Sequence, residues 1–194
     1  MPPDGLIGAV LCGGRSRRFG DGDKALAPAG EVPLGQLVVN ALRGAGIDPV
    51  VAVGGTAGPE LGLVTVPDRW PDQGPLAGLA TILWWARRGD VLVVPCDLPL
   101  LTSEVLVQLV GARDRRRGQG GREALVASVD GRPRHSVGIW PAERFGAIRQ
   151  LIEQGERRFG AALEVVSWRS VEVPEVALSD ADTPEQLREL LDRL

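Results

Sequence analysis

A glycine-rich, basic loop follows the first apolar segment of the chain. Gly13 and Gly14 are adjacent, and three arginines and Lys24 follow within the next ten residues. Two successive glycines let backbone N–H groups turn toward an anion with no Cβ in the way. The pattern predicts a phosphate-binding loop, although it is neither a P-loop nor a Gly-x-Gly-x-x-Gly dinucleotide motif. The alternative is a basic surface loop whose glycines only make turns.

Lys24 stands out within this loop because of the composition around it. It is the only lysine among the 22 basic residues of the chain, and the other 21 are arginine. An ammonium is a compact point charge on a flexible stem, whereas a guanidinium is a planar fork. The retention of one lysine in the most glycine-rich stretch therefore indicates that an ammonium is required there.

A carboxylate and a second acidic pair could complete such a site. Asp97 follows the apolar run 91–95, and a carboxylate at the end of a central strand could hold Mg²⁺ against a nucleotide triphosphate. The alternative is that Asp97 caps the following turn. Asp180 and Asp182 precede a helix start signal and could give the same ion a second ligand, or could serve as helix caps alone.

Strand-like and helix-like segments alternate along the chain. This order predicts a single domain over 1–194 with a doubly wound α/β fold, in which a mostly parallel sheet carries helices on both faces. Ligands in such folds bind at the carboxyl ends of the strands. We expect strands at 6–11, 49–53, 61–66, 91–95, 124–129, 136–140 and 171–173, and helices at 34–42, 75–88, 102–112, 143–154, 158–163 and from 183.

The arginine- and glycine-rich segment 113–122 has the lowest complexity in the chain. Its composition predicts a solvated mobile loop, and the alternative is an electropositive rim for an anionic partner.

The overall composition limits the classes of function. The chain has 194 residues, a net charge of −3 and two cysteines far apart in sequence. This balance offers no general attraction for nucleic acid or anionic membrane, and the cysteines do not form a disulfide framework. No apolar run approaches the roughly 18 residues of a membrane span, and the first residues lack a basic leader. We therefore expect a cytoplasmic protein.

Several motifs, in order, carry a family resemblance. Together they resemble the molybdenum cofactor guanylyltransferases, the MobA family, over nearly the whole chain. The motifs are Leu11-Cys12-Gly13-Gly14 with Arg18, Gly20, Asp23 and Lys24; Gly74-Pro75-Leu76-Ala77-Gly78; Pro95-Cys96-Asp97-Leu98-Pro99; Gly155-Glu156-Arg157-Arg158; and Asp182-Thr183-Pro184-Glu185.

The resemblance implies transfer of GMP from GTP to the phosphate of molybdopterin, with release of pyrophosphate and a requirement for Mg²⁺. It also implies delivery of the product to molybdoenzyme maturation factors. Two alternatives stay open. One is a related nucleotidyltransferase that uses CTP or another phosphorylated acceptor, and the other is a nucleotide-binding module without turnover.

The resemblance also implies roles for individual residues. Lys24, Arg18 and Asp97 would be catalytic, and Asp97 would bind the metal, with Asp182 as a second ligand. Nucleotide binding would fall to Leu11, Cys12, Gly13, Gly14, Lys24, Asp68, Gly78 and Asp97. The acceptor side would be formed by Arg134, His135, Arg157 and Arg158, each of which could instead have a surface ion-pair or packing role.

Two departures from the family pattern bear on this site. Cys12 stands where relatives often have alanine, and Gly54-Gly55 follow the second strand where relatives carry an asparagine at the nucleotide edge. If the first and fourth strands are neighbours, Cys12 and Cys96 leave adjacent strand ends about 4.8 Å apart, so a disulfide under oxidation is a hypothesis.

Overall fold

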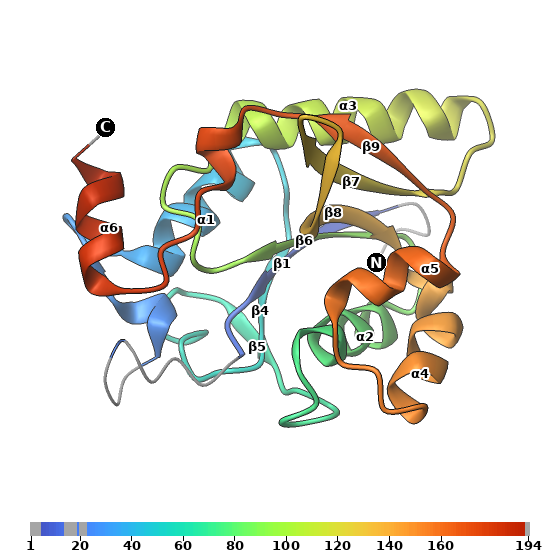
Figure 1. Ribbon diagram of the computed structural model, residues 1–194, viewed down its shortest axis with the longest axis horizontal. Helices are drawn as coiled ribbons and strands as arrows, with labels where there is room; N and C mark the ends of the chain where they lie inside the picture. Colours follow the sequence, from blue (N-terminus) through green and yellow to red (C-terminus); the bar gives the residue numbers. More distant parts are fainter. Residues whose placement is uncertain (1–4, 14–18, 20–22, 193–194) are drawn as a thin grey trace.

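The computed structural model describes residues 5–13, 19 and 23–192. Figure 1 shows a twisted central sheet between two layers of helices. The strands are β1 (Leu6–Leu11), β2 (Pro28–Ala29), β3 (Val32–Pro33), β4 (Val50–Val53), β5 (Val64–Val66), β6 (Asp90–Pro95), β7 (Ala124–Val129), β8 (Arg132–Pro141) and β9 (Trp168–Glu172). The α-helices are α1 (Leu34–Gly44), α2 (Pro75–Ala86), α3 (Ser103–Gly118), α4 (Phe145–Glu153), α5 (Ala162–Val165) and α6 (Pro184–Leu191). The 3-10 turns are η2 (Lys24–Leu26), η3 (Ala142–Arg144), η4 (Phe159–Ala161) and η5 (Glu175–Leu178).

Seven strands form the main sheet, in the order β5-β4-β1-β6-β8-β7-β9. β5, β4, β1 and β6 are parallel, β8 runs antiparallel to both of its neighbours, and β7 and β9 are parallel. Leu11 pairs with Val53 on one side and with Pro95 on the other. The three central strands therefore end level, and the loops that follow them meet at one edge of the sheet. The expected doubly wound, mostly parallel fold is confirmed.

The two faces of the sheet bury different sets of side chains because strand residues alternate in direction. Val10, Ala52, Leu92 and Val94 pack against α1 and α3. The alternate positions, such as Ala9 and Val93, pack against α2, α4 and α5. Figure 1 shows α3 above the sheet and α2 with α4 below it. The apolar residues at odd and even positions of one strand therefore belong to two separate cores, one on each face of the sheet. This pattern predicted central strands that are buried on both faces.

A third, smaller core attaches α6 to the body of the protein. Leu187 and Leu190 of α6 are buried with Leu34, Leu100 and Ala181. The helix begins at a capping box, in which the Thr183 side chain accepts from Gln186 N at 3.2 Å and Gln186 Oε1 accepts from Thr183 N at 3.1 Å. The start signal Thr-Pro-Glu-Gln was predicted correctly from the sequence.

The prediction for the arginine-rich segment was wrong. Residues 113–118 continue α3 as regular helix, and a short turn follows before β7. Arg113 Nε and Arg117 Nε donate to Asp90 Oδ2 at 2.5 and 2.9 Å, and the Asp90 side chain is 6% exposed. The last turns of the helix are therefore fixed to the start of β6 by a largely buried carboxylate, which composition alone could not reveal.

Several boundaries also differ from those expected. β5 covers only Val64–Val66 because turns occupy the preceding residues, and β8 is longer than predicted. β7 and β8 form a hairpin through Asp130 (φ 50°) and Gly131 (φ 72°), an Asp-Gly turn signal that the sequence interpretation overlooked. The last strand is Trp168–Glu172 rather than 171–173, the β2–β3 hairpin was missed, and Thr102 precedes α3 without a capping bond from its side chain.

Among the described residues, no helix has the length and apolarity needed to cross a membrane.

Candidate active site

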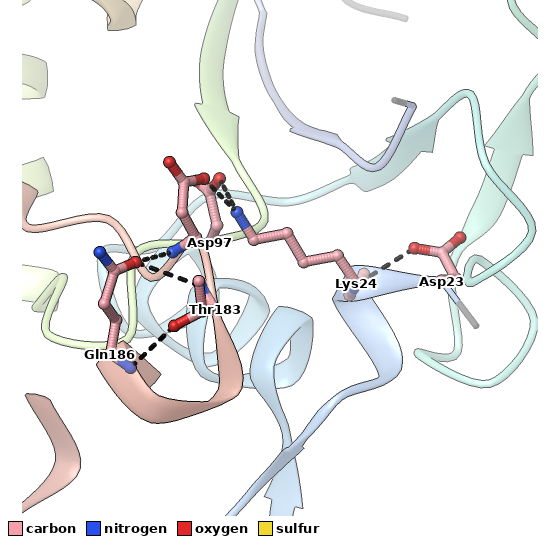
Figure 2. Close-up of polar contacts among 7 residues, drawn as sticks. Asp23, Lys24, Asp97, Thr183 and Gln186 are labelled. Atoms are coloured by element: carbon pink, nitrogen blue, oxygen red, sulfur yellow. Dashed lines mark hydrogen bonds and ion pairs between the residues drawn. The ribbon is translucent and has the colours of Figure 1, made fainter. Parts of the chain in front are cut away.

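Lys24 joins two carboxylates at the edge where the central strands end. Its Nζ lies 2.7 Å from Asp97 Oδ2 and 3.0 Å from Asp182 Oδ1. Figure 2 shows the lysine side chain extending from the η2 turn toward Asp97, with the capping box of α6 beside them. A cavity of about 470 Å³ lies between η2 and α6, where residues such as Asp23, Leu26 and Leu187 line it, and the three residues of the cluster are not part of its lining. The structure thus brings Lys24 and Asp97 together, as predicted, and Asp182, the acidic residue before α6, also contacts Lys24.

The positions of both carboxylates follow from the backbone. Asp97 lies two residues beyond β6, and its carbonyl oxygen accepts from Ala181 N at 2.9 Å, which holds the segment before α6 against the end of the sheet. Gln186 Oε1 then accepts from Asp182 N at 2.8 Å as part of the capping box. The same residues that start α6 therefore fix Asp182 beside Lys24.

Asp23 anchors the lysine turn, a role that the sequence interpretation did not assign. Asp23 Oδ1 accepts from Ala25 N at 3.1 Å, and Oδ2 accepts from Thr56 N and Ala57 N at 2.9 and 3.1 Å. One carboxylate thus caps η2 and joins it to the loop after β4. Asp directly before a short helical segment is a capping signal that could have indicated the first contact, but not the second.

The glycines after β4 have a structural reason. Gly54 and Gly55 adopt positive φ angles of 66° and 62°. A Cβ on Gly55 would lie 2.6 Å from Cys12 O and 2.7 Å from Asp23 Oδ2. No larger residue fits at Gly55 without displacing the loop after β1, so this glycine accompanies a close backbone contact.

The predicted phosphate loop is described only in part. Gly14 and Arg18 lie outside the described residues. Cys12 N and Gly13 N both donate to Val53 O, at 3.0 and 3.2 Å. The Gly13 amide is therefore already engaged by the neighbouring strand in this structure, whereas the sequence interpretation expected it to face the triphosphate.

The residues expected at the nucleoside lie at the same edge of the sheet. Asp68 follows β5, and its Oδ1 accepts from Trp70 N at 3.0 Å and from Thr81 Oγ1 at 3.1 Å. Gly78 on α2 faces β1, since a Cβ there would lie 3.4 Å from Leu11 Cδ2. The structure thus brings Leu11 and Gly78 together, and it gives Asp68 a local structural role in the turn before α2.

The expected acceptor-side residues lie in two places, with Arg134 and His135 on β8 and with Arg157 and Arg158 between α4 and η4. Leu76 N donates to Arg157 O at 3.3 Å, and the Arg157 guanidinium donates to Gln73, so this segment is attached to the loop before α2. His135 lies on β8 next to the carboxyl end of β6 and stacks on Phe159, with ring centroids 5.7 Å apart. Arg134 and Arg158 are exposed, and the Arg158 guanidinium pairs with Glu156.

Glu156 organises the Gly-Glu-Arg-Arg turn, and the sequence interpretation gave it no role. Its Oε1 accepts from Arg157 N and Arg158 N at 2.8 Å each, and its Oε2 accepts from Arg158 Nη2 at 2.6 Å. The Arg158 side chain and these amides lower the pKa of Glu156 to about 2. The carboxylate is therefore ionised at every physiological pH and holds both arginines of the turn in place.

Opposing influences act on the protonation of Lys24. Burial favours the neutral amine, but hydrogen bonds and charges from Asp97 and Asp182 outweigh burial and raise the pKa of Lys24 above its ordinary value. The side chain is 13% exposed, against 50% for Asp182, so the cluster opens to solvent on the Asp182 side. At neutral pH the lysine is a fully charged ammonium.

Cys12 and Cys96 lie together at the ends of β1 and β6, as expected for neighbouring strands. Both are buried and free. A hydrogen bond with the Cys12 thiol, together with burial, raises the pKa of Cys96 well above its ordinary value. The Cys96 thiol is therefore protonated at neutral pH. Disulfide formation under oxidation stays a prediction, testable by thiol titration before and after mild oxidation.

We expect the single imidazole of the chain to titrate below its ordinary pKa. Burial, and to a lesser degree the charge of Arg134, lowers the pKa of His135. The unfolded chain therefore binds this proton more readily, and the free energy of unfolding should fall as pH drops through about 6.5. An NMR titration of the one histidine Cε1–H signal should give a midpoint below about 6.5. A midpoint at or above that value would contradict the buried, stacked position.

The donor set fits a hard divalent cation. Among the described residues, no group of three or more His, Cys, Asp and Glu side chains gathers to form a complete metal cage. Mg²⁺, however, is commonly bound by one or two carboxylates that leave positions for water and substrate phosphates. Asp97 and Asp182, whose carboxylates both contact the Lys24 ammonium, match that arrangement.

Comparisons with known proteins agree with this geometry. A family model described as "MobA-like NTP transferase domain" matches residues 8–168. A probable molybdenum cofactor guanylyltransferase from Methanothermobacter thermautotrophicus is 32% identical over 166 residues, covering 82% of this chain and 83% of the relative.

Solved structures share the fold over almost the whole chain. Molybdopterin-guanine dinucleotide biosynthesis protein A from Archaeoglobus fulgidus has a TM-score of 0.75 at 21% identity, over 96% of this chain and 97% of that one. A Mycobacterium tuberculosis H37Rv protein in complex with manganese has a TM-score of 0.72 at 20% identity, over 98% and 100% of the two chains. The chain therefore belongs to the MobA-like NTP transferase family, and the nucleotidyltransferase activity expected from its sequence is confirmed at the level of that family.

Proposed function

We propose that the protein transfers the GMP part of GTP to the phosphate of molybdopterin. An oxygen of the acceptor phosphate bonds to the α-phosphorus of GTP, the bond from that phosphorus to the bridging oxygen breaks, and pyrophosphate leaves. The observation that carries this proposal is the convergence of Lys24, Asp97 and Asp182 at the strand-end edge of a chain whose relatives include molybdenum cofactor guanylyltransferases.

The chemistry explains why this site contains charges rather than a general base. A phosphate monoester has a second pKa near 6, so the acceptor is already largely ionised at pH 7 and needs no proton removed. The difficulty is to bring two anions together in line, which requires positioning and charge neutralisation. Lys24 supplies a positive charge for the α-phosphate, and Asp97 and Asp182 supply the anchor for a divalent cation.

Mg²⁺ is the proposed metal. When bound, it would neutralise negative charge on the triphosphate and hold its oxygens at a fixed place. Asp97 would be the principal ligand because β6 positions it rigidly, and Asp182 would be the second. The manganese complex of the structurally similar mycobacterial protein supports a divalent cation in this fold.

The remaining residues take the roles that the family resemblance suggests. Gly13, Gly14 and Arg18 would bind the triphosphate, although the Gly13 amide must first leave Val53 O. The nucleoside would lie against Leu11, Cys12, Asp68 and Gly78. The acceptor would lie toward Arg134, His135, Arg157 and Arg158, where Glu156 keeps the arginine turn in shape.

Nucleotide preference is the sharpest test of the guanylyltransferase assignment. With Mg²⁺ present, GTP at a hundred times its Kd adds about 2.7 kcal/mol to the free energy of unfolding. For a chain of this size the expected rise in Tm is about 5–10 °C. CTP, ATP and UTP at the same concentration should give much smaller rises, and pyrophosphate release with GTP should require molybdopterin. A rise with CTP and none with GTP would replace the assignment with a cytidylyltransferase.

We also propose that residues 1–194 act as a single nucleotidyltransferase domain in the cytoplasm and that the product passes to molybdoenzyme maturation factors. The single-domain proposal is supported by the third core, which joins α6 to Leu34 and Leu100.

A further inference from the structure

Lys24 Nζ lies between the two carboxylates that are the proposed metal ligands. Oδ2 of Asp97 and Oδ1 of Asp182 both lie within 3.0 Å of the same nitrogen, so one cation bridges the two carboxylates. A divalent cation held by Asp97 and Asp182 would require the carboxylate oxygens that now accept from Nζ. The ammonium and the metal therefore compete for one pair of oxygens.

We propose that Lys24 is the resident counter-ion of the metal site and that metal loading is a cation exchange. Asp97 and Asp182 would hold the divalent cation, and the Lys24 ammonium would leave the two carboxylates and turn to the phosphate oxygens of the nucleotide. This inference rests on the proposed function, because it requires that Asp97 and Asp182 bind the catalytic metal.

The surrounding contacts allow this exchange to be a movement of one side chain. The Lys24 backbone is held by the Asp23 cap and by the attachment of Asp23 to Thr56 and Ala57. The lysine stem is flexible, and its Nζ also lies 5.5 Å from the centre of the Phe19 ring. The Asp182 side chain is 50% exposed and the Asp97 side chain 21%, so the pair is more open to solvent at Asp182 than at Asp97.

The exchange makes metal and nucleotide binding cooperative. Without nucleotide, a metal ion must displace the ammonium from both carboxylates, and within the described part of the chain no other carboxylate forms an ion pair with Lys24. We therefore expect the metal to bind weakly. With nucleotide, the phosphates accept the displaced ammonium, so each ligand strengthens the binding of the other by the same factor. The inference also explains the single lysine, since an arginine fork would pair with the carboxylates more rigidly and resist displacement.

The test is Mn²⁺ binding by the nucleotide-free protein, measured from the EPR signal of free Mn²⁺. Lys24→Met should bind Mn²⁺ at least about tenfold more tightly than the original protein, because removal of one unit charge at this distance is worth at least that factor. Adding a non-hydrolysable GTP analogue should tighten Mn²⁺ binding strongly in the original protein and much less in Lys24→Met. Equal Mn²⁺ affinities of the two proteins without nucleotide would overturn the exchange.

Matched variants separate this inference from the proposed function. Arg149→Met removes the same charge from an exposed pair with Glu153 on α4 and should leave Mn²⁺ affinity unchanged; a tenfold effect there would assign the gain to net charge and overturn the inference. Asp97→Asn should abolish tight Mn²⁺ binding with the analogue present, and unchanged binding would refute the proposed metal site itself. If Lys24→Met does not fold, Lys24→Gln provides the same comparison with a polar side chain.

Discussion

Asp97→Asn is expected to reduce kcat for pyrophosphate release about 10³-fold while the protein stays folded. The amide keeps the shape of the side chain but removes the charge that would hold the metal. Loss of a single preorganised electrostatic group at a reacting centre typically costs 10²–10³ in rate. Turnover is measured as pyrophosphate released from GTP in the presence of Mg²⁺ and molybdopterin, with circular dichroism to confirm the fold.

A matched substitution controls for charge. Asp192→Asn neutralises an exposed aspartate just after α6 and should leave kcat within a factor of about two, since surface substitutions away from special features have effects near zero. Asp97→Asn with more than a tenth of the original turnover would remove Asp97 from the catalytic role.

Asp90→Ala, a substitution outside the active site, is expected to lower the free energy of unfolding by about 3 kcal/mol. Asp90 lies at the amino end of β6, and its side chain is nearly buried between Arg113 and Arg117. Removal of one member of a buried ion pair costs about 3–5 kcal/mol because charge is left without its compensating partner. Urea unfolding should show a lower midpoint with an unchanged slope.

An exposed ion pair provides the comparison for this substitution. Glu153→Ala removes the carboxylate that Arg149 contacts at 3.2 Å on the surface of α4, and a loss of about 0.5 kcal/mol or less is expected. Equal losses for the two substitutions would show that the Asp90 cluster contributes no more than an ordinary surface pair.

The sequence predicted the central sheet and the meeting of Lys24 with Asp97 for one physical reason. Runs such as 91–95 are apolar at both parities, which is typical of strands covered by helices on both faces. Parallel strands place their carboxyl ends at one edge, so loops 73 residues apart in sequence must meet there. Local pattern and a topological rule together were sufficient for these two residues.

Other parts depended on pairings that no local pattern encodes. The segment 113–122 has the composition of a loop, yet residues 113–118 are helical. Arg113 and Arg117, one helical turn apart, both contact the carboxylate of Asp90, and this contact stabilises the helix. Asp23 acts through the amides of Thr56 and Ala57, more than thirty residues away. Glu156 accepts hydrogen bonds from Arg157 and Arg158, which follow it directly in the chain. Its role in positioning this turn depends on the hydrogen bond between Arg157 and Leu76 of α2, which the sequence does not show.

The place of Asp182 in the chain has a consequence for how the protein is made. All strands of the seven-stranded sheet in the described part of the chain precede Asp182, and so do Lys24 and Asp97. As the ribosome extends the chain, the lysine can therefore neutralise its first carboxylate before the second one has been synthesised. The acidic pair is therefore completed only after every strand of the seven-stranded sheet in the described part of the chain has been synthesised.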